Sequence, residues 1–156
     1  MEAQLINEEW LSKLHEKAAR DERLRIGFDL RTTPEDSSQR MLNVMEIGTH
    51  VPIHRHLNTS ETVVCLEGCL DWVFFSEQSD VGEHYEQKAS MDEGAPIPER
   101  EIAADESCFV ETARFRLCPR EGLYGIQVPI GVWHSVVLYE PSTILEAKDG
   151  KYEARK

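Results

Sequence analysis

The sequence predicts one mostly-β domain, a sandwich or barrel of short strands preceded by a single N-terminal helix. Three observations lead to this prediction. The chain has 156 residues, which is the usual size of one domain. Between residues 40 and 148, short apolar runs alternate with turn signals that contain Gly or Pro, the pattern of an antiparallel β-protein. Residues 7–20, by contrast, have apolar residues at helical spacing.

The N-terminal helix is expected over residues 7–20. Asn7 can cap its first turn, and Glu8 and Glu9 place negative charge near the positive end of the helix dipole. Its apolar stripe consists of Trp10, Leu11, Leu14 and Ala18. Such a stripe is typical of a packing face. We therefore expect residues 1–27 to form a helical segment that packs on the β domain.

The β domain itself is expected over residues 28–156. It begins with a polar segment, 28–39, whose Thr-Pro and Ser-Ser pairs predict a loop. The predicted strands are 40–47, 61–66, 69–76, 109–117, 122–128, 133–140 and 142–148. Residues 77–107 are acidic and weakly periodic, so we expect a long surface excursion from the sheet and not a second domain.

Composition excludes several classes of function. Seventeen Lys and Arg residues stand against 29 Asp and Glu, a net charge of −12, which argues against nucleic-acid binding and against a polybasic membrane anchor. No apolar run approaches the roughly 20 residues of a spanning helix, and the N-terminus does not resemble a secretory signal. We therefore expect a cytoplasmic protein with reduced cysteines, a Cys-ligated metal being the alternative for Cys65, Cys69, Cys108 and Cys118.

Three histidines and one glutamate form a candidate metal site. His54 and His56 are two residues apart, so in an extended chain both imidazoles project from the same face. Glu61 opens the next apolar run after a short polar link, and His134 opens a later strand behind a turn that contains Pro129. A lone histidine on a strand is usually a core or surface residue. The combined spacing favours a site for one divalent transition metal, Fe, Mn, Ni, Co or Zn.

The segment around these residues resembles the two motifs of the cupin superfamily. The first motif is matched by Gly48, His54, His56, Glu61 and Gly68. The second is matched by Pro129, Gly131 and His134. The chain departs from the second motif at Leu138, where Asn is common, and at position 123, which lacks the expected glycine. These departures affect turn and packing positions and none of the ligands. Gly68, between two apolar runs, is expected in a tight turn with positive φ.

The whole chain resembles the small bacterial WbuC-type cupins, which are linked to O-antigen and other surface-polysaccharide gene clusters. This likeness covers the N-terminal helix, the segment PIHRH, the segment VPIGVWHSV and the closing ILEAKDGKYE. It implies a double-stranded β-helix, two antiparallel sheets rolled into a small barrel. It also implies that His54, His56, Glu61 and His134 line the barrel mouth as metal ligands. The reaction of these relatives is not established, so the resemblance implies a site more than an activity.

Other residues are weaker candidates for binding a small-molecule ligand. Arg40 and Asn43 begin the strand before Gly48, and one of its faces can line the cavity. Tyr124 flanks the second motif. Arg55 lies between the two histidines and must point to the opposite face, so we expect a surface or interface cation there.

Three functions fit this site. A metal-dependent oxygenase, isomerase or lyase would use an open coordination position on a small polar or sugar-derived molecule. A non-catalytic module would bind a ligand and report it to a partner. A structural metal would only stiffen the barrel. The apolar segments VVCL and WVFF, together with the helix, also predict a homodimer.

Overall fold

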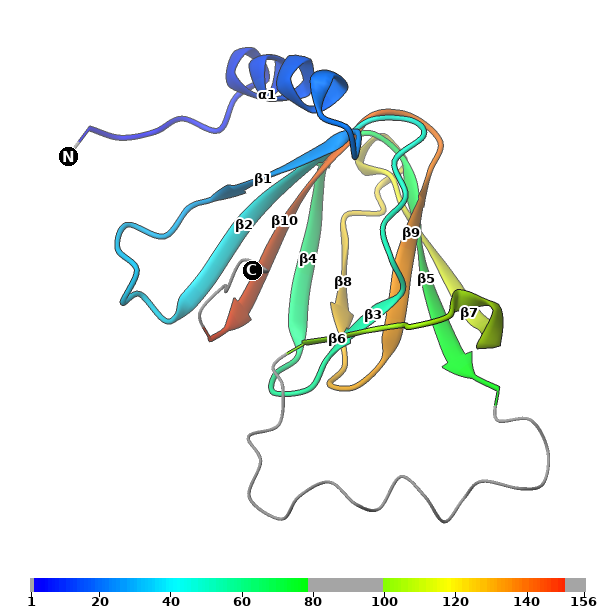
Figure 1. Ribbon diagram of the computed structural model, residues 1–156. Helices are drawn as coiled ribbons and strands as arrows, with labels where there is room; N and C mark the ends of the chain where they lie inside the picture. Colours follow the sequence, from blue (N-terminus) through cyan, green and yellow to red (C-terminus); the bar gives the residue numbers. More distant parts are fainter. Residues whose placement is uncertain (1, 79–99, 151–156) are drawn as a thin grey trace.

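A computed structural model describes residues 2–78 and 100–150 of the chain (Figure 1). Within these residues two five-stranded antiparallel sheets face each other. The first sheet has the order β1 (Arg25–Asp29), β2 (Ser38–Met45), β10 (Ser142–Asp149), β4 (Glu61–Glu67) and β8 (Gly125–Val128). The second has the order β6 (Arg100–Ile102), β3 (His54–His56), β9 (Trp133–Leu138), β5 (Leu70–Glu77) and β7 (Phe109–Leu117). The predicted fold class, a double-stranded β-helix with an N-terminal helix, is confirmed.

The apolar core fills the space between the two sheets at the end where their central strands approach each other. Along β4, residues 61, 63 and 65 are buried and the residues between them are exposed, as expected of a strand with one inward face. The buried core consists of Met45, Val63, Cys65, Leu70, Trp72, Leu117, Val128 and Ile144. This packing fixes the register of both sheets and therefore of the side chains at the open end.

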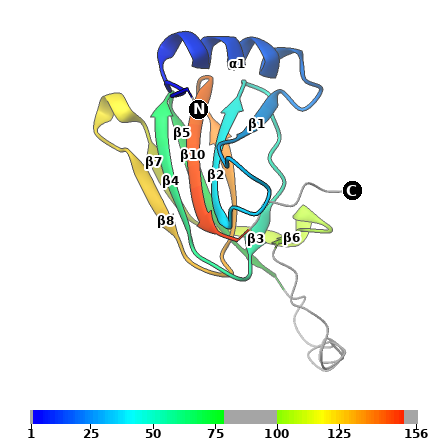
Figure 2. The ribbon, with the colours of Figure 1, turned by 90° about the vertical axis from the view of Figure 1, so that its left-hand side faces the viewer.

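Helix α1 (Glu8–Arg20) crosses one end of the first sheet and packs on the outer face of β1 and β2 (Figure 2). The Asn7 side chain caps it by accepting a hydrogen bond from the backbone N–H of Trp10 at 3.0 Å. Its buried residues pack with Leu42 and Val44 of β2, so β2 is covered on both faces. The helix leaves the inner face of the same strands free to line a cavity.

Two predictions made from the sequence were wrong in part. The expected loop 28–39 is shorter, because β1 includes Phe28 and Asp29 and β2 begins at Ser38. β1 is an exposed edge strand, which explains its polar composition. The segment WVFF is not an exposed face, since Trp72 and Val73 are buried in the central strand β5.

The predicted excursion 77–107 is described only in part. Residues 79–99 lie outside the described residues. Beyond them, β6 pairs with β3, and a short 3-10 helix, η1 (Glu106–Cys108), leads into β7. The excursion therefore returns a strand to the sheet that carries three of the four candidate metal ligands.

Local backbone features agree with the turn predictions. Gly68 lies between β4 and β5 with φ of +96°, and a Cβ there would lie 2.5 Å from the carbonyl oxygen of Pro141. Only glycine fits such a position without displacing backbone. No disulfide joins the four cysteines, and no helix among residues 2–78 and 100–150 is long and apolar enough to cross a membrane.

Candidate metal centre

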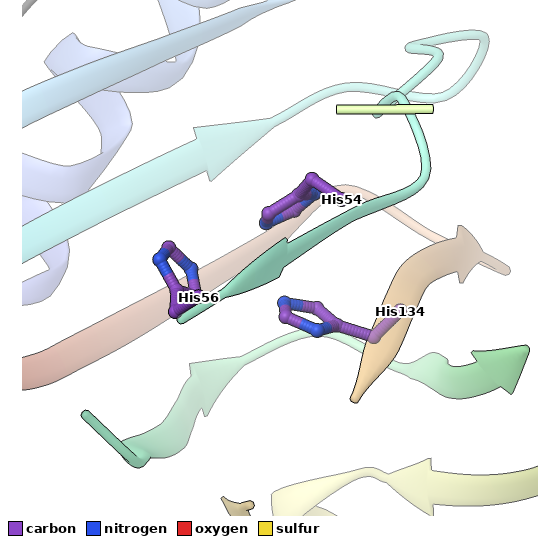
Figure 3. A group of neighbouring side chains, drawn as sticks. All are labelled: His54, His56 and His134. Carbon is purple, nitrogen blue, oxygen red and sulfur yellow. The ribbon is translucent and has the colours of Figure 1, made fainter. Parts of the chain in front are cut away.

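The three predicted histidines meet at one end of the second sheet (Figure 3). His54 and His56 project from β3, and His134 lies opposite His54 in the register of β3 with β9. One ring nitrogen from each histidine lies within 4.8 Å of the others. The rings point toward one another, and that of His134 stacks on Trp72 with centroids 5.2 Å apart. Packing thus fixes these side chains before any ion binds.

Hydrogen bonds set the tautomer of two of these rings. The Nδ1–H of His54 donates to the carbonyl oxygen of Pro52 at 2.8 Å, and that of His134 donates to the carbonyl oxygen of Val132 at 2.9 Å. A carbonyl can only accept, so in the neutral ring Nε2 carries a lone pair. The Nε2 atom of His134 is buried and has no hydrogen-bond partner among the described residues. Backbone-oriented imidazoles with a free Nε2 are the usual arrangement of metal-ligating histidines.

Burial keeps these imidazoles neutral. Desolvation lowers the pKa of His54 well below its ordinary value, and the charges of His134 and Arg100 lower it further. Desolvation likewise lowers the pKa of His134 to about 4. Both rings are therefore deprotonated at neutral pH, the state that binds a metal.

Glu61 brings a carboxylate to the same place. Its side chain is 1% exposed, and its Oε2 atom lies 2.8 Å from Nε2 of His56. Burial raises its pKa to about 7, while the positive charges of Lys148 and Arg100 act in the opposite direction. Its Oε1 atom accepts no hydrogen bond from the described part of the chain. An isolated buried carboxylate is costly, and a cation at this point would compensate it.

The donor set fits a divalent transition metal. Three imidazole nitrogens and one carboxylate oxygen are ligands that suit Fe, Mn, Ni, Co or Zn, and they leave one or two positions open on a five- or six-coordinate ion. Histidine and carboxylate ligands come from β3, β4 and β9, which belong to both sheets. The three histidines singled out by their spacing in the sequence thus lie together in the fold. Glu61 contacts this group through His56 and lies outside the set of ligand atoms that are all within 4.8 Å of one another.

The histidines border a cavity of about 370 Å³ between the sheets. Strand alternation places its polar lining on the inner face of the first sheet, where Lys148 lies opposite both Gln39 and Glu61 and where Glu146 lies opposite Met41. The charged and amide side chains of the lining are Arg23, Arg25, Asp29, Gln39, Asn43, Arg100, Glu146 and Lys148. A polar cavity beside an open coordination position has the composition of a small-molecule site.

Glu146 is a functional candidate that the sequence analysis missed. It lies on β10 between the inward positions 144 and 148, and it lines the cavity. Burial and the nearby charge of Glu61 raise its pKa to about 8, against the opposing effects of His56, Arg100 and Asn43. The alternation of Ile144, Glu146 and Lys148 along a predicted strand was the signal that could have revealed it.

The weaker candidates have different positions. Asn43 lines the cavity, whereas Arg40 lies on the other face of β2 and forms an ion pair with Asp36 at 2.7 Å. The two positions differ by an odd number of residues, so they cannot share a face. Tyr124 is 64% exposed and does not line the cavity. Arg55 points outward, pairs with Glu101 at 2.6 Å and lies over the ring of Trp133.

The raised pKa of Glu146 predicts a pH dependence of stability in the metal-free protein. The folded state holds this proton up to about pH 8, whereas the unfolded chain releases it near pH 4.5. The contribution of this group to the free energy of unfolding is therefore complete below pH 4.5. It decreases as the pH rises and is lost once the pH passes 8. The buried histidines act in the opposite direction, below about pH 6.5. Glu61, whose pKa burial raises to about 7, titrates in the same range. Between pH 6.5 and 8 we expect the two carboxyl groups together to cost about 2–3 kcal/mol, most of it from Glu146.

Urea unfolding of chelator-treated protein at pH 6.5 and pH 8 measures this loss. Glu146→Gln should remove most of it, while Glu111→Gln, which changes an exposed carboxylate of β7, should retain it. The same decrease in both variants and wild type would mean that Glu146 does not carry the proton.

Comparison with known families identifies where the chain belongs. A family model described as "Domain of unknown function (DUF6016)" matches residues 6–86, just over half of the chain. The chain belongs to the DUF6016 family. In this DUF6016 protein the matched region includes His54, His56 and Glu61, and His134 lies beyond it. No curated protein matches the sequence.

The solved structures that resemble this DUF6016 protein include two kinds of protein with the cupin fold, CapF and L-ribose isomerase. One is the capsular polysaccharide assembling protein CapF from Staphylococcus aureus, with a TM-score of 0.52, 15% identity and coverage of 85% of this chain and 30% of that chain. Another is L-ribose isomerase from Acinetobacter sp. DL28, with a TM-score of 0.55 and 17% identity. The match covers 85% of this chain and 61% of the isomerase. L-ribose isomerase from Cellulomonas parahominis has a TM-score of 0.55 and 16% identity, and the match covers 93% of this chain and 83% of the isomerase. This chain therefore spans under a third of CapF and less than two thirds of the Acinetobacter enzyme. At these identities the likeness establishes the cupin fold alone.

Proposed function

We propose that this DUF6016 protein is a small metal-dependent enzyme that acts on a small polar, sugar-derived molecule. The metal ligands are His54, His56, His134 and Glu61, and the ion is Fe, Mn, Ni, Co or Zn. The observation that carries the proposal is the lone pair of His134 Nε2, buried and unbonded within the described residues, at the edge of a polar cavity that also holds Glu146. A purely structural metal would not need such a cavity.

The chemistry follows from the residues around the cavity. A bound divalent ion would supply Lewis-acid polarisation of a substrate oxygen. Glu146 would hold or accept a proton at a neighbouring carbon or hydroxyl, while Asn43 and Lys148 would orient hydroxyl groups. A second carboxylate beside the metal site favours isomerase or lyase chemistry over an oxygenase, because both reactions transfer a proton.

Several finer features belong to the same proposal. The resemblance to WbuC-type cupins supports a role in surface-polysaccharide metabolism within the cytoplasm, and CapF, a capsular polysaccharide assembling protein, shares the fold. L-ribose isomerase, which shares the fold too, acts on a sugar as its name says. Val64 and Leu66 of β4 each expose 36% of their surface and would contribute to a homodimer. Sedimentation at micromolar concentration would test the dimer, and monomer alone would refute it.

Incorporation of solvent deuterium into a substrate tests the proposed catalytic function directly. Metal-loaded protein is incubated in D₂O with a panel of aldoses, ketoses and sugar acids, and NMR detects deuterium at carbon. We expect deuterium incorporation that a chelator abolishes and that Glu146→Gln slows at least about 100-fold while keeping its metal. The control Glu111→Gln should retain the wild-type rate.

Two other results would contradict the proposal that this protein is an enzyme. Binding of a sugar by the metal-loaded protein without exchange or product would indicate a non-catalytic binding module. A chelator that lowers only the melting temperature, with neither binding nor exchange in the loaded protein, would indicate a structural metal.

A further inference from the structure

Two arginines border the cavity from opposite sheets. Arg25 belongs to β1, the edge strand of the first sheet, and Arg100 belongs to β6, the edge strand of the second. Both line the cavity that holds the histidines. The open side of the cavity between these two edges, here called the mouth, therefore carries a guanidinium on each side.

Strand register directs Arg100 toward the candidate metal site. In the antiparallel pairing of β3 with β6, Arg100 lies directly opposite His56. Residues directly opposite each other in a sheet project to the same face. The next outward-facing pair, Arg55 and Glu101, bonds on the other face of the sheet. Arg100 is thus on the face of the metal ligands.

Neither arginine forms an ion pair with a carboxylate of the described residues, although Asp29 and Glu146 line the same cavity. Arg25 makes its two hydrogen bonds from Nη1, to the carbonyl oxygen of His50 at 2.8 Å and to Oγ1 of Thr49 at 3.4 Å. These bonds fix the side chain and leave Nε and Nη2 without a hydrogen bond to a described residue. Burial lowers the pKa of Arg25, and the positive charges of Arg23 and Arg100 lower it further, whereas the charge of Asp21 acts in the opposite direction. The charges of Arg23, Arg25 and Arg100 are therefore close enough to act on one another at the mouth.

Deeper in the cavity, a buried amide oxygen lacks a partner. Gln39 is 4% exposed, lines the cavity and lies opposite Lys148. Its Oε1 atom accepts no hydrogen bond from the described part of the chain. A buried polar atom without a partner costs about 1–3 kcal/mol, and a ligand hydroxyl would satisfy it.

We propose that the cavity binds a small polyhydroxylated molecule with one anionic group, which Arg25 and Arg100 hold at the mouth while a hydroxyl donates to Gln39. The anion is a carboxylate or a phosphate, both of which match the bidentate geometry of guanidinium. This inference rests on the proposed function, because the other end of the ligand would bind the metal ion. It adds that the substrate is an acidic or phosphorylated sugar and not a neutral one.

Calorimetric titration of metal-loaded protein with three probes tests the proposal. The probes are glucuronate, glucose 6-phosphate and glucose. We expect at least one anionic sugar to bind at least tenfold more tightly than glucose, and Arg100→Gln and Arg25→Gln each to weaken its binding about tenfold. The matched control is Arg40→Gln, on the outer face of β2, which should bind like wild type. A preference for glucuronate identifies a carboxylate, and one for glucose 6-phosphate identifies a phosphate.

Equal affinity for the three probes, or unchanged binding in Arg100→Gln, would overturn the anion site. Arg100→Gln is the decisive variant, because Arg25 also anchors the segment before β3 and its loss can perturb folding. Metal content measured in the same samples separates the two proposals. Wild-type protein that binds no metal refutes the proposed function, whereas metal-loaded protein with no preference for anionic sugars refutes only this inference.

Discussion

Replacing His134 by alanine should reduce bound metal to less than a tenth of the wild-type amount. His134 supplies the Nε2 lone pair that completes the three-histidine cluster, and its ring cannot be replaced by backbone or solvent in that buried position. Loss of one ligand in four should weaken metal affinity by at least about 100-fold, since even changes around the ligands cost about 10- to 100-fold. Elemental analysis of protein purified without an affinity tag measures the result.

Two further variants make this result specific. His134→Gln preserves much of the side-chain volume beside Trp72 and should lose metal equally, which separates ligation from packing. His50→Ala removes an exposed histidine whose partner is Glu106, and it should retain the full metal content. One equivalent of metal in His134→Ala would contradict the assignment of this residue as a ligand.

Removing the metal should lower the melting temperature of the wild-type protein by about 10 °C. An ion that binds only the folded state at 1,000 times its dissociation constant stabilises that state by about 4 kcal/mol. In a chain of this size each kcal/mol corresponds to about 2–4 °C. The physical reason is local, because Glu61 and the imidazoles are buried together and the ion compensates their desolvation.

Thermal unfolding with and without a chelator, at constant pH and ionic strength, measures this shift. The chelator should have no effect on His134→Ala, which already lacks the ion. A wild-type melting temperature that does not change on chelation, in protein shown to have released its metal, would contradict a stabilising metal centre.

The cluster of three histidines could be predicted from the sequence in large part because short-range geometry determines the positions of two of them. His54 and His56 share a face in any extended segment, and Glu61 begins a strand whose alternation directs it inward. His134, by contrast, is 78 residues from His56 in the chain. The match of Pro129 and Gly131 to the second cupin motif predicted its place.

The cavity lining could not be predicted in the same way. Lys148 and Glu146 belong to a strand that was predicted, and alternation groups them on one face with Ile144. The pairing of this strand between β2 and β4 is what places that face along a polar cavity. Arg100 comes from a three-residue strand that exists through pairing with β3, a tertiary effect without a local pattern. β1 was missed because an exposed edge strand lacks the apolar alternation of a half-buried one.

Anomalous diffraction from crystals of the untagged protein, recorded at the absorption edge of the metal found by elemental analysis, tests the central claim most directly. The account predicts one strong peak about 2.0–2.2 Å from Nε2 of His54 and His134, bounded also by His56 and Glu61. The open side of that ion should face the cavity. A crystal whose metal peak lies elsewhere, with the three imidazoles bonded only to protein or water, would contradict it.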